Sequence, residues 1–122
     1  MILIIQTSAK NEFIDITQKI EQSLDKNRKT VTVYVPHTTA AITINENADP
    51  TVEEDILDYL AKLVPPGNYK HAEGNSDGHI KASLIGSNVT IPIIDGKLAL
   101  GTWQGIFFCE FDGPRERKVV IA

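Results

Sequence analysis

Short runs rich in β-branched and aromatic residues recur along the 122-residue chain, and they constrain its fold more than any other feature. Runs of this length and composition predict strands. They cover 1–7, 30–36, 38–46, 88–94 and 113–122. The segment 97–112 predicts a long strand or a pair of strands, and the Asp-Gly pair just before it predicts a hairpin turn.

Two longer segments predict helices. Isoleucine and leucine recur every four residues in 13–26, which is the spacing of a helical stripe. The segment 47–67 favours a second helix, because Asp49 is a typical N-cap and Pro50 a typical first helical residue. The segment 79–86 fits either a strand or a short helix.

This order of elements predicts an α+β fold: a largely antiparallel β-sheet or sandwich with two main helices, in a single domain over 1–122. The one cysteine, Cys109, excludes an internal disulfide, and we expect it to be a buried, inert thiol. No apolar run approaches the length of a membrane span, and the first residues lack the features of a signal peptide. We therefore expect a cytoplasmic protein without a membrane partner.

The net charge of −4 argues against a nucleic-acid partner, since proteins that bind nucleic acid usually carry a basic face. The one dense basic cluster consists of Arg115, Arg117 and Lys118. It is too small to outweigh the acidic balance, but it leaves room for a local pocket that holds one phosphate.

Two of the three histidines lie in the stretch HAEGNSDGH, which begins at His71 and ends at His79. Imidazole and carboxylate groups are the usual ligands of zinc and similar ions. The spacing matches no standard zinc motif, however, and a solvated loop with a turn at Asn75 and Asp77 explains the same residues. His37 lies at the end of a predicted strand, and the three histidines form one site if it converges with the other two. Otherwise His37 is a strand-end histidine without a functional role.

Other polar residues follow or interrupt predicted strands. Glu46 ends a strand of small and apolar residues, where a carboxylate indicates a general base or a metal ligand. Arg115 follows a turn, from which its planar donors can reach a phosphate or carboxylate, or form a salt bridge with a neighbouring acidic residue. Trp103 fits a core position or a ligand platform. Glu110 alternates with apolar neighbours, which predicts an outward-facing side chain.

Three stretches taken together resemble the YjbQ-like family, described as secondary thiamine-phosphate synthase enzymes. They are PHTTAAITINENADP, HAEGNSDGHIKASLIGSNVTIPI and LGTWQGIFFCEFDGPRERKVVI. The resemblance covers nearly the whole chain in the same order. It implies a small α+β protein that assembles as a homotrimer, with sites near subunit boundaries and a divalent metal, zinc or magnesium.

The resemblance also implies roles for particular residues. The metal ligands would be His37, His71 and His79, and the catalytic residues Glu46 and Arg115. The substrate-binding residues would be Asn45, Asn75, Asp77, Trp103, Gln104 and Asp112.

The implied reaction joins a hydroxymethylpyrimidine diphosphate to a thiazole phosphate and releases pyrophosphate. A metal ion and Arg115 would neutralise the leaving diphosphate, and Trp103 would stack on the flat ring. Two other functions stay open. One is metal-assisted hydrolysis of a phosphate ester. The other is a non-catalytic trimer that binds a small molecule or a metal.

Overall fold

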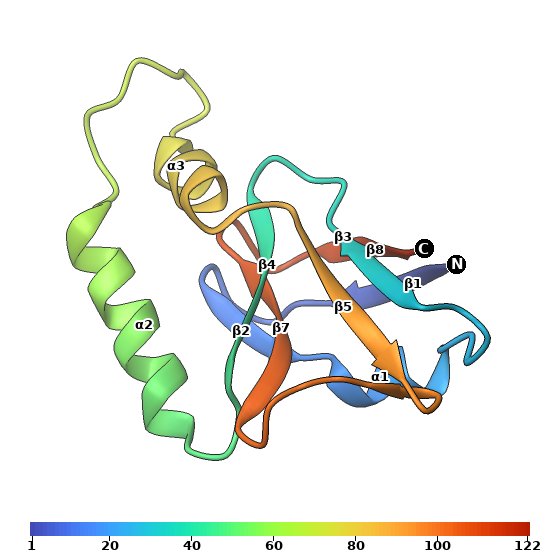
Figure 1. Cartoon of the computed structure of the whole chain (residues 1–122). Coiled ribbons are helices and arrows are strands. Elements are labelled where there is room, and N and C mark those ends of the chain that lie inside the picture. Colours follow the sequence, from blue (N-terminus) through green and yellow to red (C-terminus); the bar gives the residue numbers. More distant parts are fainter.

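The computed structural model describes residues 1–122, which form two antiparallel sheets and three helices (Figure 1). The five-stranded sheet has the order β1 (Ile2–Gln6), β8 (Glu116–Ile121), β3 (Thr30–Tyr34), β5 (Asn88–Ile94), β6 (Lys97–Leu98). The three-stranded sheet has the order β2 (Glu12–Asp15), β7 (Gln104–Glu110), β4 (Ala40–Glu46). The helices are α1 (Thr17–Gln22), α2 (Pro50–Leu63) and α3 (Ser76–Ile85). The predicted α+β fold is confirmed.

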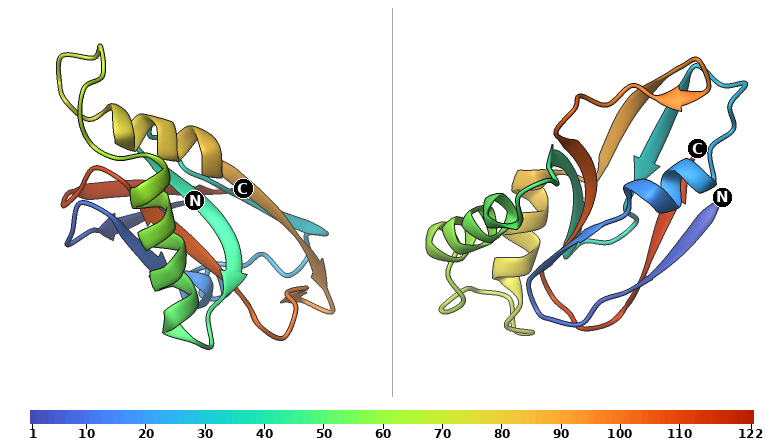
Figure 2. Two further views of the ribbon diagram at one scale, coloured as in Figure 1. Left: turned by 90° about the vertical axis from the view of Figure 1, so that its left-hand side faces the viewer. Right: turned by 90° about the horizontal axis from the view of Figure 1, so that it is seen from below.

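The apolar core lies in two layers. One layer fills the space between the two sheets, and the other lies between the three-stranded sheet and helices α2 and α3 (Figure 2). Strand β7 is the middle strand between these layers, so every residue from Gly105 to Glu110 is buried. A strand covered on both faces shows no alternation of polar and apolar residues, which is why β7 reads as a continuous apolar run.

Helix α2 confirms the prediction made from its first residues. The Asp49 side chain accepts a hydrogen bond from the backbone N–H of Thr51 at 2.9 Å, and Pro50 is the first helical residue. This cap satisfies one of the N–H groups that a helix leaves unbonded at its start. Leu60 of this helix is buried in the second apolar layer.

The prediction of one helix over 13–26 is wrong. The first part of the segment forms β2, in which Phe13 pairs with Cys109 of β7, and only Thr17–Gln22 is helical. Ile16 and Ile20 are both fully buried between the sheets. Their four-residue spacing therefore reflects a single helical turn that covers the core, while pairing with a distant strand decides the structure of the residues before it.

Two open alternatives are resolved. The segment 79–86 belongs to helix α3, which begins at Ser76 and adds a third, shorter helix to the two predicted. The segment 97–112 contains two strands, β6 and β7, which lie in different sheets. Cys109 is buried as predicted, and burial raises the pKa of its thiol, so it is inert.

Candidate functional site

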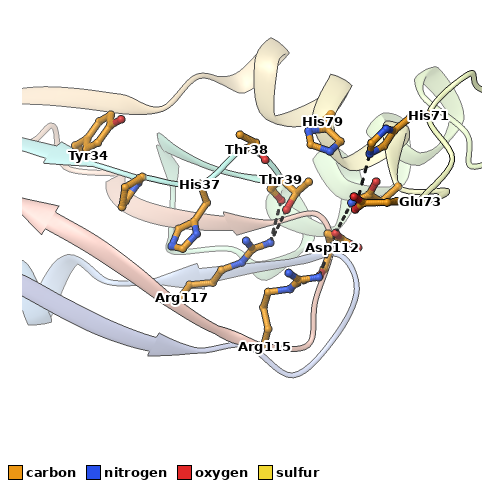
Figure 3. Close-up of a pocket in the computed structure, with 12 residues that line it drawn as sticks. Tyr34, His37, Thr38, Thr39, His71, Glu73, His79, Asp112, Arg115 and Arg117 are labelled. Atoms are coloured by element: carbon orange, nitrogen blue, oxygen red, sulfur yellow. Dashed lines mark hydrogen bonds and ion pairs between the residues drawn. The ribbon is translucent and has the colours of Figure 1, made fainter.

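A cavity of about 700 Å³ opens at one end of the two sheets, where the connections β3–β4, α2–α3 and β7–β8 meet (Figure 3). We call it the polar pocket. Its lining comes from these connections, from the adjoining strands and from the start of α3: Tyr34, Pro36, His37, Thr38, Thr39, His71, Glu73, Asn75, His79, Asp112, Arg115 and Arg117.

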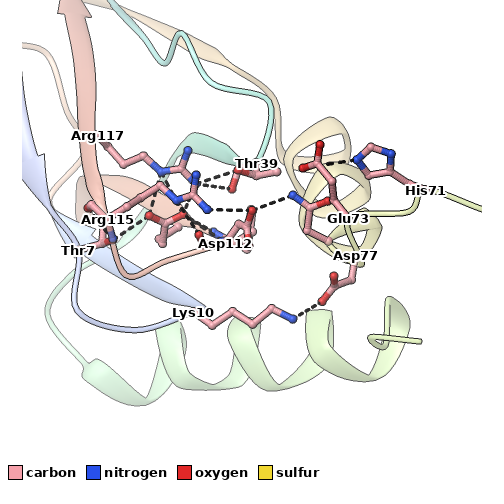
Figure 4. Close-up of polar contacts among 12 residues, drawn as sticks. Thr7, Lys10, Thr39, His71, Glu73, Asp77, Asp112, Arg115 and Arg117 are labelled. Atoms are coloured by element: carbon pink, nitrogen blue, oxygen red, sulfur yellow. Dashed lines mark hydrogen bonds and ion pairs between the residues drawn. The ribbon is translucent and has the colours of Figure 1, made fainter. Parts of the chain in front are cut away.

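Arg117, one of the residues that line the polar pocket, forms a buried ion pair with Glu110. Glu110 and Arg117 expose 0% and 3% of their side chains, and Arg117 Nε donates to Glu110 Oε1 at 2.9 Å (Figure 4). Arg117 Nη2 also donates to Thr39 Oγ1 at 2.8 Å. The prediction that Glu110 faces outward is wrong: β7 is covered on both faces, so its carboxylate is enclosed and takes a charged partner from β8.

The same carboxylate positions the β7–β8 turn. Glu110 Oε2 accepts hydrogen bonds from the backbone N–H groups of Phe111 and Asp112, both at 3.0 Å, and Oε1 accepts from the Thr7 hydroxyl at 2.8 Å. Burial alone would raise the pKa of Glu110. The hydrogen bonds from Arg117 and Thr7 outweigh burial and hold this pKa below its ordinary value. Glu110 is therefore a carboxylate at neutral pH.

Arg115 is fixed beside the pocket by Asp112. Its Nε donates to the Asp112 carbonyl oxygen at 2.9 Å and its Nη2 to Asp112 Oδ2 at 3.2 Å, while half of the side chain stays exposed. These bonds use two of the five N–H groups of a guanidinium and leave three for a ligand. Asp112 Oδ2 also accepts from Asn75 Nδ2 at 2.9 Å, so one carboxylate ties Arg115 to the start of α3. The salt bridge that the sequence offered as one alternative for Arg115 is thus present, and its partner is Asp112.

His71 and His79 lie together across the pocket from the arginines (Figure 3). Their ring centroids are 5.4 Å apart, and the rings are nearly perpendicular. His71 Nε2 is 3.8 Å from Glu73 Oε2, and both of these side chains are well exposed.

His37 has a different environment. Its Nε2 accepts a hydrogen bond from the backbone N–H of Lys118 at 2.9 Å. Burial and the nearby charge of Arg117 lower the pKa of His37. The ring is therefore neutral, with its proton on Nδ1 and the lone pair of Nε2 already engaged.

The three histidines do not fit the expected metal site. No three His, Cys, Asp or Glu side chains in the chain are grouped so that they could hold a metal ion. A histidine ligand must offer a free lone pair, and His37 as placed has none, because one nitrogen accepts from Lys118 and the other carries the proton. The expected zinc or magnesium stays a prediction from the sequence.

The structure divides the other predicted site residues. His37, His71, Asn75, His79, Asp112 and Arg115 all line the polar pocket. Asp77 does not: it is buried behind the first turn of α3, where Lys10 Nζ donates to its Oδ2 at 2.8 Å. Burial alone would raise the pKa of Asp77, but the bond from Lys10 outweighs it and the pKa is lowered. Asp77 thus joins α3 to the segment after β1.

The remaining four predicted residues form a separate group at the far end of the three-stranded sheet. Glu46 pairs with Gln104 and Asn45 with Gly105, and Trp103 is exposed next to them. Strand β4 runs from Ala40 beside the pocket to Glu46, a distance of roughly 20 Å at the usual rise per residue. Within one chain, the groups implied as catalytic, Glu46 and Arg115, do not meet.

Several lining residues were not assigned to the site from the sequence, and the most informative of them is Arg117, which was named only as part of the basic cluster. Arg117 alternates with Val119 and Ile121 along β8, and all three are buried on the inner face of the sheet. A cation on the apolar side of an alternating strand signals a buried partner. Thr38 and Thr39, directly after His37, also line the pocket.

Comparison with known proteins places the chain in a family. The family model described as "UPF0047 protein YjbQ-like" matches residues 1–122. The chain belongs to this family. Among UPF0047 relatives, it is 53% identical to a protein of Methanocaldococcus jannaschii, with 96% of this chain and 88% of the relative covered. It is 46% identical to YugU of Bacillus subtilis, with 96% and 92% covered.

Solved structures share the fold. A family member from Clostridium acetobutylicum aligns with a TM-score of 0.96 at 54% identity, covering 100% of this chain and 98% of that one. A conserved hypothetical protein from Thermus thermophilus aligns with a TM-score of 0.95 at 41% identity, again covering 100% and 98%.

These comparisons correct the expected function. The matching UPF0047 proteins and structures are described as family members, uncharacterised or hypothetical, and their descriptions name no reaction. Membership of this family therefore does not imply a metal-dependent enzyme with thiamine-phosphate synthase activity, and that expectation is wrong. The same correction applies to its hydrolase and metal-binding alternatives. Transferase, zinc and homotrimer likewise find no support in these relatives. None of the helices has the length and hydrophobicity that a transmembrane span requires.

Proposed function

We propose that the polar pocket binds a small phosphorylated molecule through direct hydrogen bonds from the protein. The observation that carries the proposal is the placement of Arg115. Asp112 fixes its guanidinium on the cavity that His71 and His79 also line, with three N–H groups left unbonded. A planar guanidinium matches two oxygens of a phosphate at once, and these charge-assisted bonds are among the strongest in proteins.

Further donors line the same cavity. Thr39 Oγ1 accepts from Arg117, so its own hydroxyl hydrogen is available to a ligand. The ion pair with Glu110 neutralises Arg117. The buried acid thus holds Arg117 in the lining of the pocket, while Arg115 and the histidine pair supply the groups that select an anion.

Titration calorimetry with inorganic phosphate and with methyl phosphate tests this proposal. We expect saturable binding to the wild-type protein and a loss of about tenfold or more in affinity for Arg115→Met, which corresponds to one strong hydrogen-bonded contact. The matched control is Arg28→Met, because Arg28 is exposed and lies outside the polar pocket. Added chelator should leave the affinity unchanged, since the donors are protein groups.

Two results would contradict the proposal. One is the absence of phosphate binding by the wild-type protein. The other is equal binding by the wild-type protein and Arg115→Met.

Three sequence-based predictions accompany the proposal. The protein acts in the cytoplasm, it uses neither nucleic acid nor a membrane as a partner, and it assembles as a homotrimer. The net charge of −4 supports the prediction about nucleic acid.

A further inference from the structure

The connection between α2 and α3 forms one wall of the polar pocket. Its residues 65–74 are called the 65–74 loop. Figure 1 shows the loop extending beyond the ends of both helices. Every residue in the loop is exposed, and the loop supplies His71 and Glu73 to the lining of the pocket.

The hydrogen bonds of the 65–74 loop are all internal. The Tyr69 hydroxyl donates to the Pro65 carbonyl oxygen at 2.7 Å, and the Tyr69 backbone N–H donates to the Gly67 carbonyl oxygen at 2.9 Å. The Gly74 N–H donates to the His71 carbonyl oxygen at 3.3 Å. No hydrogen bond joins the loop to a residue outside it. A segment with few bonds to the rest of a protein opens at little cost in free energy.

The residues on either side of the loop are fixed. Val64 is buried, and its backbone N–H donates to the Leu60 carbonyl oxygen at 2.9 Å. Asn75 Nδ2 donates to Asp112 Oδ2 at 2.9 Å. Movement of the loop is therefore confined to the residues between these two anchors.

Two glycines lie where the loop can bend. The φ angles of Gly67 and Gly74 are +147° and +77°, which other residues rarely adopt. A Cβ at either position would meet no atom within 4 Å, so the backbone conformation and not a lack of space favours glycine. Residues that absorb large changes of backbone angle serve as hinges in loop closure.

A cavity beneath the loop gives it room to move. The cavity has a volume of about 670 Å³ and lies between residues 68–71 on one side and α3 on the other. Tyr69 of the loop and Ile80 of α3 line it, and they are 38% and 37% exposed. Movement of the loop towards α3 would bury part of this apolar surface, which is favourable.

The ligand of the polar pocket would favour the closed position. Arg115 is held by Asp112, and His79 belongs to the rigid helix α3, whereas His71 lies on the movable wall. The rings of His71 and His79 already contact edge to face, with their centroids 5.4 Å apart. A phosphate that gains a hydrogen bond from His71 only after closure shifts the loop towards that state.

We infer that the 65–74 loop is a lid that closes over the polar pocket when phosphate binds, with Gly67 and Gly74 as hinges and His71 as the contact that holds it shut. This inference rests on the proposed phosphate binding and adds how access to the site is controlled.

Limited proteolysis with trypsin tests the lid. Lys70 is an exposed trypsin site in the middle of the loop, and exposed loops are preferred sites of cleavage. Cleavage of a segment that opens and closes quickly follows the population of its open form, so we expect saturating inorganic phosphate to slow cleavage after Lys70 by about tenfold. Mass spectrometry of the fragments gives the rate. Cleavage after Lys26, in the exposed turn between α1 and β3, is the internal control and should not change.

Two variants identify the contact that closes the lid. At phosphate concentrations that calorimetry shows to be saturating for each protein, His71→Ala should lose the protection of Lys70. His79→Ala is the matched control, because it removes a pocket histidine that lies outside the loop, and it should keep the protection. His71 is exposed, so its replacement does not disturb the core.

The outcomes separate the lid from the proposed function. Unchanged cleavage after Lys70 at saturating phosphate would overturn the lid and leave phosphate binding in place. Equal slowing after Lys70 and Lys26 would also overturn it, because general stabilisation or inhibition of trypsin would then explain the effect. Protection that persists in His71→Ala would overturn the role of His71. Failure of phosphate to bind in calorimetry would overturn the proposed function itself.

Discussion

Glu110 and Arg117 show how a single enclosed pair organises the polar pocket. Their hydrogen bonds reach Thr7 after β1, Thr39 before β4 and the turn between β7 and β8. A buried pair gains little over well-packed apolar residues, because both charges must leave water. Removing one partner is different, since the other charge then stays buried without compensation.

The first prediction concerns this pair. Glu110→Ala should lower the free energy of unfolding by about 3–5 kcal/mol, because it strands the Arg117 guanidinium inside the protein. Urea denaturation measures the effect, with Glu21→Ala, an exposed change on α1, as the control. A cost for Glu110→Ala no larger than that of the control would contradict the enclosure of the pair.

The pKa of Glu110 makes a second prediction, for pH. Its pKa in the folded protein lies below the ordinary value for glutamate, about 4.3. The unfolded chain therefore binds more protons in the acidic range, so this stabilisation is complete above the unfolded pKa and is lost as the pH falls through the folded one. We expect the free energy of unfolding to decrease from about pH 5 to pH 3, and to decrease less in Glu110→Gln. Asp77, whose pKa is also lowered, should keep part of the slope in that variant. Identical slopes in the two proteins would disprove the assignment to Glu110.

At the scale of elements, helix α3 determines where two residues of the polar pocket, Asn75 and His79, lie. Gly78 faces the end of β7 so closely that an added Cβ would meet the Phe111 carbonyl oxygen at 2.7 Å. A backbone oxygen cannot move aside cheaply, so glycine is required for this approach. Helix α3 therefore sits at a defined depth, which places His79 beside His71.

The third prediction follows from this close approach. Gly78→Ala should displace α3 and weaken phosphate binding several-fold, at a cost in stability of about 1–3 kcal/mol for the overpacking. Leu84→Ala, at an exposed position of the same helix, is the control. Calorimetry and thermal unfolding provide the two readouts. Unchanged phosphate affinity in Gly78→Ala would show that the depth of α3 does not matter to the site.

Elements with local signals could be predicted from the sequence, and elements set by distant partners could not. The cap at Asp49 and the two prolines that follow α2 are local, and that helix was expected where it lies. Strand β2 depends on pairing with β7, nearly a hundred residues later in the chain. The local sequence does not show this pairing, and its isoleucine and leucine spacing predicts a helix there instead. Glu110 is different, because the continuous apolar run before it indicates a strand covered on both faces, and the expected alternation overlooked this signal.

At the scale of the whole molecule, the polar motifs divide between two ends. The histidine, asparagine and aspartate–arginine motifs lie at strand ends and turns and converge on the polar pocket, a convergence that the sequence left open. The group around Glu46 and Trp103 lies at the other end of β4. The sequence could not reveal this separation, because it shows the order of motifs but not the direction in which a strand carries them.

The outer face of the five-stranded sheet leads to the fourth prediction. Ile2 pairs with Val120, which also pairs with Tyr34, so the three form one row across the strands; Ile2, Tyr34 and nearby Ile4 are largely exposed. Such a face next to an unpaired edge strand favours association. We expect light scattering to give three times the mass of one chain, and Ile4→Lys to shift the protein towards monomer. A wild-type mass equal to one chain would reject the trimer.

The strand order also bears on how the protein is made. The middle strand of the three-stranded sheet is β7, and β8 lies between β1 and β3 in the other sheet. Synthesis proceeds from the N-terminus, so β2 and β4 meet no partner until β7 leaves the ribosome, and β1 meets none until β8 follows. Chains whose strands pair locally can fold while they are synthesised. The two sheets of this protein cannot be completed until β7 and β8 have been made. A chain that stops before β7 lacks the middle strand of one sheet and the strand that joins β1 to β3 in the other, so neither sheet can be completed.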